Sequence, residues 1–221
     1  MSTIAIIGGT GPQGKGLGYR FAKGGHDVIL GSRSEERAME AAAELHQRPI
    51  AGSVRGAANA KAAEAADLVL LAIPFDGHDE LVADLAPQLA GKVVISCVNP
   101  LGFDKHGPYG LDLGPTSAAE NAQRLLPDAH VIGAFHHLSA VTLAGEAEVL
   151  DHEDVLVCGD DADAKAAVIE LAVTVTGRPG VDAGVLRLAR QLEPLTAVLI
   201  SVNKRYKVRS GIAVVGLDGH A

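Results

Sequence analysis

A run of glycines directly after a short apolar segment constrains the fold of this chain more than any other feature. Ile4 to Ile7 is continuously apolar, as in a strand covered on both faces, and Gly8-Gly9-Thr10-Gly11-Pro12-Gln13-Gly14 follows it. Helix-forming residues come next. This order of strand, turn and helix predicts a Rossmann-type unit that holds a pyrophosphate at the helix N-terminus.

The loop residues have distinct expected roles. Gly9 permits the tight turn, Gly11 lets the backbone approach the pyrophosphate, and Gly14 lets the helix pack close to the strand. A structural glycine turn is the alternative, and the position after the first strand of the chain argues against it. We therefore expect a dinucleotide site at Gly9, Thr10, Gly11, Pro12, Gln13 and Gly14.

The second apolar segment, Val28 to Leu30, leads into Gly31-Ser32-Arg33, where NAD-binding proteins usually carry an acid. A carboxylate there would repel a 2′-phosphate, whereas a serine hydroxyl donates to it and a guanidinium pairs with it. The sequence therefore predicts NADP(H). Arg37 follows one helical turn after Arg33 and either adds a second positive charge or pairs with neighbouring glutamates in solvent.

Apolar segments alternate with Ala-rich segments of helical length along most of the chain. The expected strands are residues 4–7, 28–30, 68–73, 93–97 and 131–134, and the expected helices are 15–23, 35–46, 57–65, 79–89 and 117–126. This alternation predicts an α/β fold with a doubly wound, mainly parallel sheet. We expect an NADP-binding domain over residues 1–140 and a small C-terminal α/β domain over residues 141–221.

The expected small domain contains a strand at residues 155–158, a helix at 162–175, a long apolar helix at 185–202 and a final strand at Ile212 to Val215. The apolar residues of the long helix cover more than one stripe, so the helix buries two faces. The second face either meets another copy of the chain, giving a homodimer or higher homo-oligomer, or stays inside one subunit.

Composition excludes several classes of partner. The formal net charge is −8 and no segment concentrates Lys or Arg, so we expect no nucleic-acid partner. No apolar run approaches the roughly 20 residues that cross a bilayer, and no basic leader precedes the first strand, so we expect a cytoplasmic protein that does not enter a membrane. Cys97 and Cys158 are isolated in apolar segments, as expected for buried, reduced thiols.

Several motifs together resemble one known family. They are the glycine loop with Gly14-Lys15-Gly16, then Gly31-Ser32-Arg33, Ile73-Pro74-Phe75, Ala134-Phe135-His136, Val157-Cys158-Gly159-Asp160-Asp161, Asp182-Ala183-Gly184 and Leu192-Glu193-Pro194-Leu195-Thr196. In order and spacing the chain resembles the F420-dependent NADP reductases. That resemblance implies reversible hydride transfer between the deazaflavin coenzyme F420 and NADP.

The resemblance also implies a set of cofactor contacts. The loop would surround the pyrophosphate, Ser32, Arg33 and Arg37 would hold the 2′-phosphate, and Ile73 and Pro74 would border the nicotinamide. The two rings would meet near His136, Leu138 and Ala140. The remaining implied contacts are Val98, Glu193 and Ile212. Ser139 and Glu193 depart from the expected family pattern, in which a proline and a hydroxyl residue are common.

Hydride transfer between two ring cofactors needs orientation more than side-chain chemistry. The sequence contains no recognisable catalytic triad and no metal-ligand pair such as His-Glu-x-x-His. We therefore expect no catalytic side chain and no metal. His136 and His137 are adjacent and on an extended segment would point to opposite sides. His136 is either a buried structural histidine or a donor to a cofactor.

Two other functions remain open at this point. One is a different NADPH-dependent reductase, acting on a small imine or keto acid, on a flavin, or on a metal as in membrane metalloreductases. The other is a non-enzymatic NADP sensor. The segment after the Rossmann unit is shorter than the substrate domain of most imine and keto-acid reductases, which disfavours the first alternative. The apolar segment from Leu138 to Leu143 favours an open cleft over a closed sensor, which disfavours the second.

Overall fold

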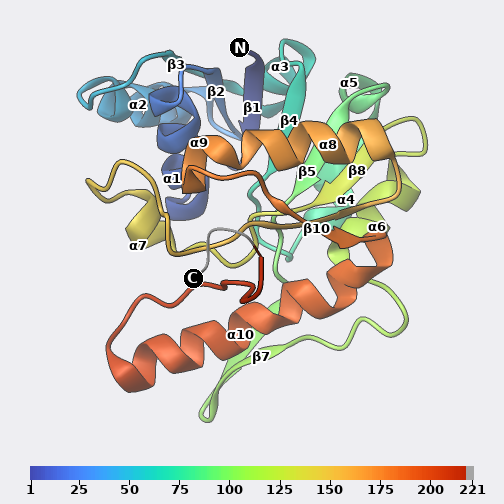
Figure 1. Cartoon of the computed structure of the whole chain (residues 1–221). Coiled ribbons are helices and arrows are strands. Elements are labelled where there is room, and N and C mark those ends of the chain that lie inside the picture. Colours follow the sequence, from blue (N-terminus) through green and yellow to red (C-terminus); the bar gives the residue numbers. More distant parts are fainter. Residues whose placement is uncertain (218–221) are drawn as a thin grey trace.

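A computed structural model describes residues 1–217. An eight-stranded sheet forms its centre, in the strand order β10-β9-β8-β5-β4-β1-β2-β3 (Figure 1). The strands are β1 (Thr3–Ile7), β2 (Asp27–Ser32), β3 (Ser53–Ala58), β4 (Leu68–Leu71), β5 (Val93–Ser96), β8 (His130–Gly133), β9 (Leu156–Gly159) and β10 (Val181–Gly184). The six strands from β3 to β8 are mutually parallel, whereas β9 is antiparallel to β8 and parallel to β10.

Helices cover both faces of the sheet. They are α1 (Pro12–Lys23), α2 (Glu35–His46), α3 (Asn59–Glu64), α4 (His78–Asp84), α5 (Ala86–Leu89), α6 (Ala118–Leu125), α7 (Ala140–Leu143), α8 (Ala162–Leu171), α9 (Val173–Thr176) and α10 (Ala189–Tyr206), with the 3₁₀ turn η1 (Leu186–Leu188). Alternate residues of β1 face opposite layers. Ile4 and Ile6 belong to the core cluster that includes residues of α1, α2 and α8, whereas Ala5 and Ile7 belong to the cluster that includes residues of α3, α4 and α6. The doubly wound fold is therefore confirmed.

The segment after residue 140 extends the same sheet. Its strands β9 and β10 pair onto β8, so the sheet continues across the domain boundary expected at residue 140. The helix expected at 185–202 begins with η1 and runs as α10 to Tyr206. Helices expected at 79–89 and 162–175 are each divided in two.

The prediction of a final strand at Ile212 to Val215 is wrong. Residues 211–214 form no regular element, and Asp154 holds their backbone instead through its main-chain amide and its side chain. The amide of Asp154 donates to the Ile212 carbonyl at 2.6 Å, and the amide of Val214 donates to the Asp154 carboxylate at 2.7 Å. We call residues 208–217 the tail.

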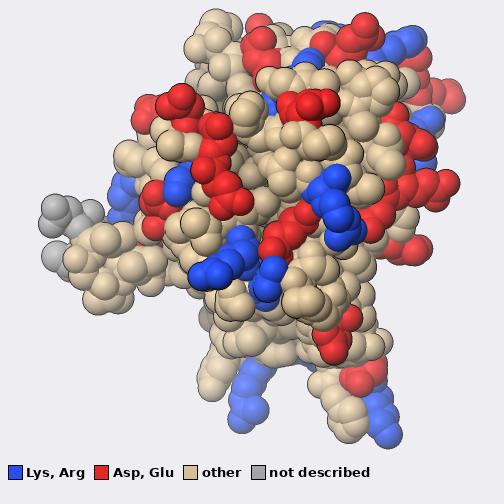
Figure 2. Space-filling model, turned by 90° about the vertical axis from the view of Figure 1, so that its right-hand side faces the viewer, with Lys and Arg blue, Asp and Glu red and all other residues tan. Residues whose placement is uncertain are grey.

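A hairpin that the sequence did not predict projects beside α10. It consists of β6 (Leu101–Asp104) and β7 (Gly107–Gly110), and β7 packs along α10 (Figure 1). Figure 2 shows acidic side chains widely spread over the face that it displays, with Lys and Arg in small groups. Within residues 1–217, no helix has the length and apolar character that crossing a membrane requires.

Candidate functional site

A cavity of about 1080 Å³ lies at the carboxyl edge of the parallel strands, between the loops after β1, β2 and β4 and the helix α10. Strand order reverses between β1 and β4, and ligands of doubly wound sheets bind at such a point. We call this cavity the cleft. Expected site residues that line it are Thr10, Gly11, Pro12, Gln13, Ser32, Arg33, Arg37, Ile73, Pro74, His136, Leu138 and Ala140.

Glycine geometry shapes the loop between β1 and α1. Gly8 has φ +78°, and a Cβ there would lie 2.6 Å from the Ala72 carbonyl oxygen. A Cβ on Gly9 would lie 2.8 Å from the Ile6 carbonyl oxygen, and one on Gly14 would lie 2.8 Å from that of Gly8. Gly9 and Gly14 therefore support the loop from within the fold and do not line the cleft.

Gly11 differs from these glycines because it borders open space. Its Cβ would meet only the Gly8 carbonyl oxygen, at 3.5 Å. Gly11 caps α1 without a side-chain hydrogen bond, and Pro12 occupies the first turn. Unpaired amides at a helix N-terminus bind anions such as a pyrophosphate. This end of α1 can therefore hold the phosphates of a dinucleotide.

The end of β2 provides donors for one further phosphate. The Ser34 amide donates to Ser32 Oγ at 3.2 Å, so the Ser32 hydroxyl proton can point toward a ligand. Arg33 and Arg37 are exposed, and neither forms a salt bridge within residues 1–217. The pairing of Arg37 with neighbouring glutamates is thus not observed. This group suits a 2′-phosphate.

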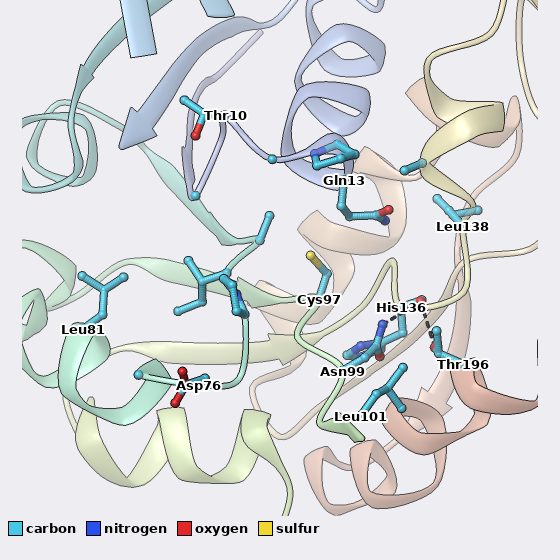
Figure 3. Close-up of a pocket in the computed structure, with 18 of the residues that line it drawn as sticks. Thr10, Gln13, Asp76, Leu81, Cys97, Asn99, Leu101, His136, Leu138 and Thr196 are labelled. Atoms are coloured by element: carbon cyan, nitrogen blue, oxygen red, sulfur yellow. Dashed lines mark hydrogen bonds between the residues drawn. The ribbon is translucent and has the colours of Figure 1, made fainter. Parts of the chain in front are cut away.

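The loops after β4 and β5 form the middle of the cleft. Ile73 and Pro74 follow β4. Cys97 and Asn99 follow β5 (Figure 3). The Cys97 thiol donates to the Leu71 carbonyl at 3.2 Å, and burial raises its pKa to about 12. A thiol with that pKa is a poor nucleophile at neutral pH. Both cysteines are buried and unpaired, as expected.

The segment from His136 to Ala140 forms the far end of the cleft. Its main chain is held by two donors, because Asn99 Nδ2 and Thr196 Oγ1 each donate to the His136 carbonyl at 3.0 Å (Figure 3). Phe135, one residue earlier, has φ +64° and packs edge-on against the buried Phe21 ring. This conformation turns the chain across the carboxyl edge of the sheet.

Both histidines of this segment are buried. Burial, with a smaller contribution from His137, lowers the pKa of His136 to about 3, so its ring is neutral. Burial also lowers the pKa of His137, whose Nε2–H donates to the Leu192 carbonyl at 2.7 Å. Within residues 1–217, no cluster of three or more His, Cys, Asp or Glu side chains could hold a metal.

Besides Gly9 and Gly14, three expected contacts lie outside the cleft lining. Val98 is buried in the core beneath it. Ile212 belongs to the tail, and its neighbour Ser210 lines the cleft instead. Glu193 is 1% exposed and accepts hydrogen bonds from the amides of Ala118 and Ala119 at 2.9 and 3.0 Å, so it caps α6. Burial raises the pKa of Glu193 to about 7, although both amides favour its charged form.

Other cleft residues were not expected from the sequence. Among them are Asn59, Asp76, Glu80, Asp84, Asn99, Thr196, Leu199, Ile200 and Asn203. Asn99 follows β5 at the carboxyl edge, so the rule that sites form there could have found it. Leu199, Ile200 and Asn203 depend on how α10 packs, which no local pattern reports.

The fold and the cleft define a Rossmann-type dinucleotide-binding protein. A family model described as "NADP oxidoreductase coenzyme F420-dependent" matches residues 3–100. An F420-dependent NADP reductase of Methanocaldococcus jannaschii is 38% identical over 227 aligned residues, which cover 97% of this chain and 99% of the relative. The chain belongs to the family of F420-dependent NADP reductases, which confirms the resemblance.

Two further relatives agree with this assignment. An F420-dependent NADP reductase of Methanothermobacter thermautotrophicus is 40% identical over 223 residues, covering 97% of this chain and 95% of the relative. A crystal structure of a putative F420-dependent NADP reductase from Arthrobacter sp. FB24 superposes with a TM-score of 0.82 at 27% identity. The superposition covers 97% of this chain and 100% of the Arthrobacter chain. The similarity therefore extends over both ends of the cleft.

Proposed function

We propose that this protein transfers a hydride reversibly between reduced coenzyme F420 and NADP, with both bound in the one cleft. The observation that carries the proposal is the continuity of the cavity. One lining joins Ser32 and Arg33, at the adenine end, to Ala140 and Thr196 at the far end. Because hydride transfer requires the two reacting carbons in contact, both rings must share one space.

NADP fits the first half of the cleft. The N-terminus of α1 would hold the pyrophosphate, and the Ser32 hydroxyl with the guanidinium groups of Arg33 and Arg37 would hold the 2′-phosphate. Ile73 and Pro74 would border the nicotinamide. The apolar side chains of Leu138, Leu199 and Ile200 at the far end would pack on the deazaflavin ring.

The protein's contribution is orientation and exclusion of water. The bound deazaflavin supplies or accepts the hydride, so the chain needs no redox group of its own. His136, with a pKa of about 3, and Cys97, with a pKa of about 12, are not poised to exchange protons near neutral pH. The doubly held His136 carbonyl fixes the main chain against which the rings would stack.

Stopped-flow absorbance of the deazaflavin, mixed with protein and NADP, tests this function directly. We expect its oxidation to be fast and reversible, without added metal, and far slower with NAD in place of NADP. NADP binding without any deazaflavin turnover would favour an NADP sensor. Oxidation of NADPH by imines, keto acids or flavins, with none by F420, would favour another reductase.

We also propose that the chain forms homodimers through α10 and the β6–β7 hairpin. These two elements pack together and carry large exposed apolar side chains, among them Val198 (55% exposed), Tyr206 (66%) and Phe103 (69%). Light scattering after gel filtration should give twice the chain mass, and a Val198→Lys, Phe103→Lys double variant should give a monomer. A cytoplasmic location and the lack of a nucleic-acid partner stay predictions.

A further inference from the structure

We propose that Arg20, a residue outside the cleft, is a positioning residue that sets the distance between the phosphate loop and the segment where the two rings meet. The inference rests on the proposed function. Arg20 lies on α1 and is completely buried. Its guanidinium donates at 2.7–3.4 Å to five main-chain carbonyls, those of Thr142, Leu143, Gly145, Ala147 and Glu148.

The five bonds join Arg20 to one short segment, which we call the 142–148 loop. Within residues 1–217 no carboxylate forms a salt bridge with Arg20, so the main-chain carbonyls make its direct hydrogen bonds and offset much of the cost of burying its charge. The Tyr19 ring, 5.8 Å from the guanidinium carbon, and the nearby carboxylates of Glu146 and Glu148 also favour the charged form. Burial lowers the pKa of Arg20, but an arginine stays protonated in proteins. A planar fork with five donors fixes direction as well as distance, which a packed apolar side chain would not do.

The hydrogen bonds between Arg20 and the 142–148 loop join two segments that lead to opposite ends of the cleft. The helix that carries Arg20 begins at Pro12, in the phosphate loop. The 142–148 loop begins within α7, whose first residue Ala140 lines the cleft. The amides of Leu143 and Ala144 donate back to the carbonyls of Ser139 and Ala140 at 2.9 and 3.1 Å. Movement of the loop would therefore move Ser139 and Ala140.

Close packing of α1 on α7 strengthens the connection. A Cβ on Gly16 would lie 2.7 Å from Leu143 Cβ, so the two helices approach through a glycine. Two further cations hold the rim of the same loop. Lys23 pairs with Glu148 at 2.9 Å, and Arg48 donates to the Gly145 carbonyl at 3.4 Å. These rim contacts would keep the loop folded near its place in an Arg20 variant.

Lys92 provides a matched control. Its ammonium donates at 2.7–2.9 Å to three main-chain carbonyls, those of Ala63, Glu64 and Ala66. It therefore resembles Arg20 as a cation bound to backbone carbonyls. However, Lys92 directly precedes β5, at the amino edge of the sheet and away from the cleft. If Arg20 acted only by stabilising the fold, replacing Arg20 and replacing Lys92 should change the transfer rate alike.

The first arm of the experiment compares wild type with the variants Arg20→Lys, Arg20→Met and Lys92→Met. It measures single-turnover hydride transfer at saturating cofactors, NADP affinity by calorimetry, and the melting temperature. For Arg20→Lys we expect an almost unchanged NADP affinity and a transfer rate lower by about tenfold or more, because small misplacements of reacting groups cost large factors in rate. Lys92→Met should lower the melting temperature and leave the rate unchanged.

The second arm follows hydrogen exchange at the amides of Leu143 and Ala144 with and without NADP. We expect NADP to slow this exchange in wild type and Lys92→Met but not in Arg20→Lys. Wild-type transfer rates in folded Arg20→Lys, or an equal loss in Lys92→Met, would overturn the positioning role. Should wild type transfer no hydride from reduced F420, the proposed function fails, and this exchange comparison alone decides whether Arg20 couples the two regions.

Discussion

The two walls of the cleft are built by different means. The wall that would hold NADP follows β1, β2 and β4, and its shape comes from local backbone geometry, as in the positive φ of Gly8. The opposite wall, from His136 to Ala140 with α10, is held by side chains distant in sequence. Thr196 and Asn99 hold the His136 carbonyl, and Arg20 holds the 142–148 loop. Local backbone geometry can be recognised from a short sequence motif, whereas contacts between residues distant in sequence produce almost no recognisable motif.

The comparison predicts that one added side chain on the NADP wall removes binding without harming the fold. Gly11→Val should abolish NADP binding, because its Cβ is tolerated by the protein but occupies the approach to the pyrophosphate. Gly14→Val is the matched variant. Its side chain would clash with the Gly8 carbonyl and should lower the melting temperature. Calorimetry beside thermal melts separates the two, and intact NADP affinity in folded Gly11→Val would move the phosphate site elsewhere.

On the opposite wall, substitution should affect rate more than binding. Ala140→Phe places a ring where the two cofactors would meet, and a displacement of about 1 Å can cost on the order of a hundredfold in rate. Contacts at Thr10, Ser32 and Arg33 would remain, so NADP affinity should change little. Stopped-flow transfer rates measured beside NADP affinity test this placement. A normal rate in the variant would show that Ala140 does not lie between the rings.

A smaller effect is expected from one charge on the NADP wall. Arg33→Ala should weaken NADP binding by about 1.5 to 3 kcal/mol, the range for hydrogen bonds to charged groups. NAD lacks the 2′-phosphate, so its affinity should stay nearly constant. Titrations of both nucleotides measure the difference, and equal losses for NADP and NAD would contradict the assignment of Arg33.

The last expected effect concerns the pH dependence of stability and the opposite wall. The pKa of His136 is about 3 in the folded chain and about 6.5 when unfolded, so the unfolded state binds more protons between these values. Its contribution to stability is complete above about pH 6.5 and is lost as pH falls toward 3. The raised pKa of Glu193 acts in the opposite direction from about pH 4.5 to 7.

Comparing wild type with His136→Gln isolates the histidine, because the contribution of Glu193 is present in both proteins. Denaturant unfolding at a series of pH values should show the free energy of unfolding of wild type falling relative to the variant below pH 6.5. Parallel curves would mean that His136 is not a buried neutral histidine in solution.

Much of the sheet could be predicted because its central strands are buried on both faces and read as apolar runs. The edge strands β3 and β10 could not, since Ser53–Ala58 and Val181–Gly184 mix polar and glycine residues that one covered face tolerates. At Ile212 to Val215 a strand was predicted that does not form. The segment is apolar, but it pairs with no strand of the described residues.

The site shows the same division. Thr10, Ser32 and Arg33 were predicted from the positions they occupy after their strands, and they line the cleft. Glu193 was placed there by resemblance, but its carboxylate turns to the amides of α6, a helix more than 60 residues earlier in the chain. Only the assembled fold reveals that contact, as it does the five bonds of Arg20.

The reversal of strand direction at β9 determines where the ends of the chain lie. Because β9 and β10 run against the other strands, the residue that precedes them, Asp154, lies at the carboxyl edge of the sheet and holds the tail there. The N-terminus, by contrast, enters at the amino edge (Figure 1). A purification tag or surface linker on the N-terminus would thus leave the mouth of the cleft open, whereas one on the tail would add bulk beside it.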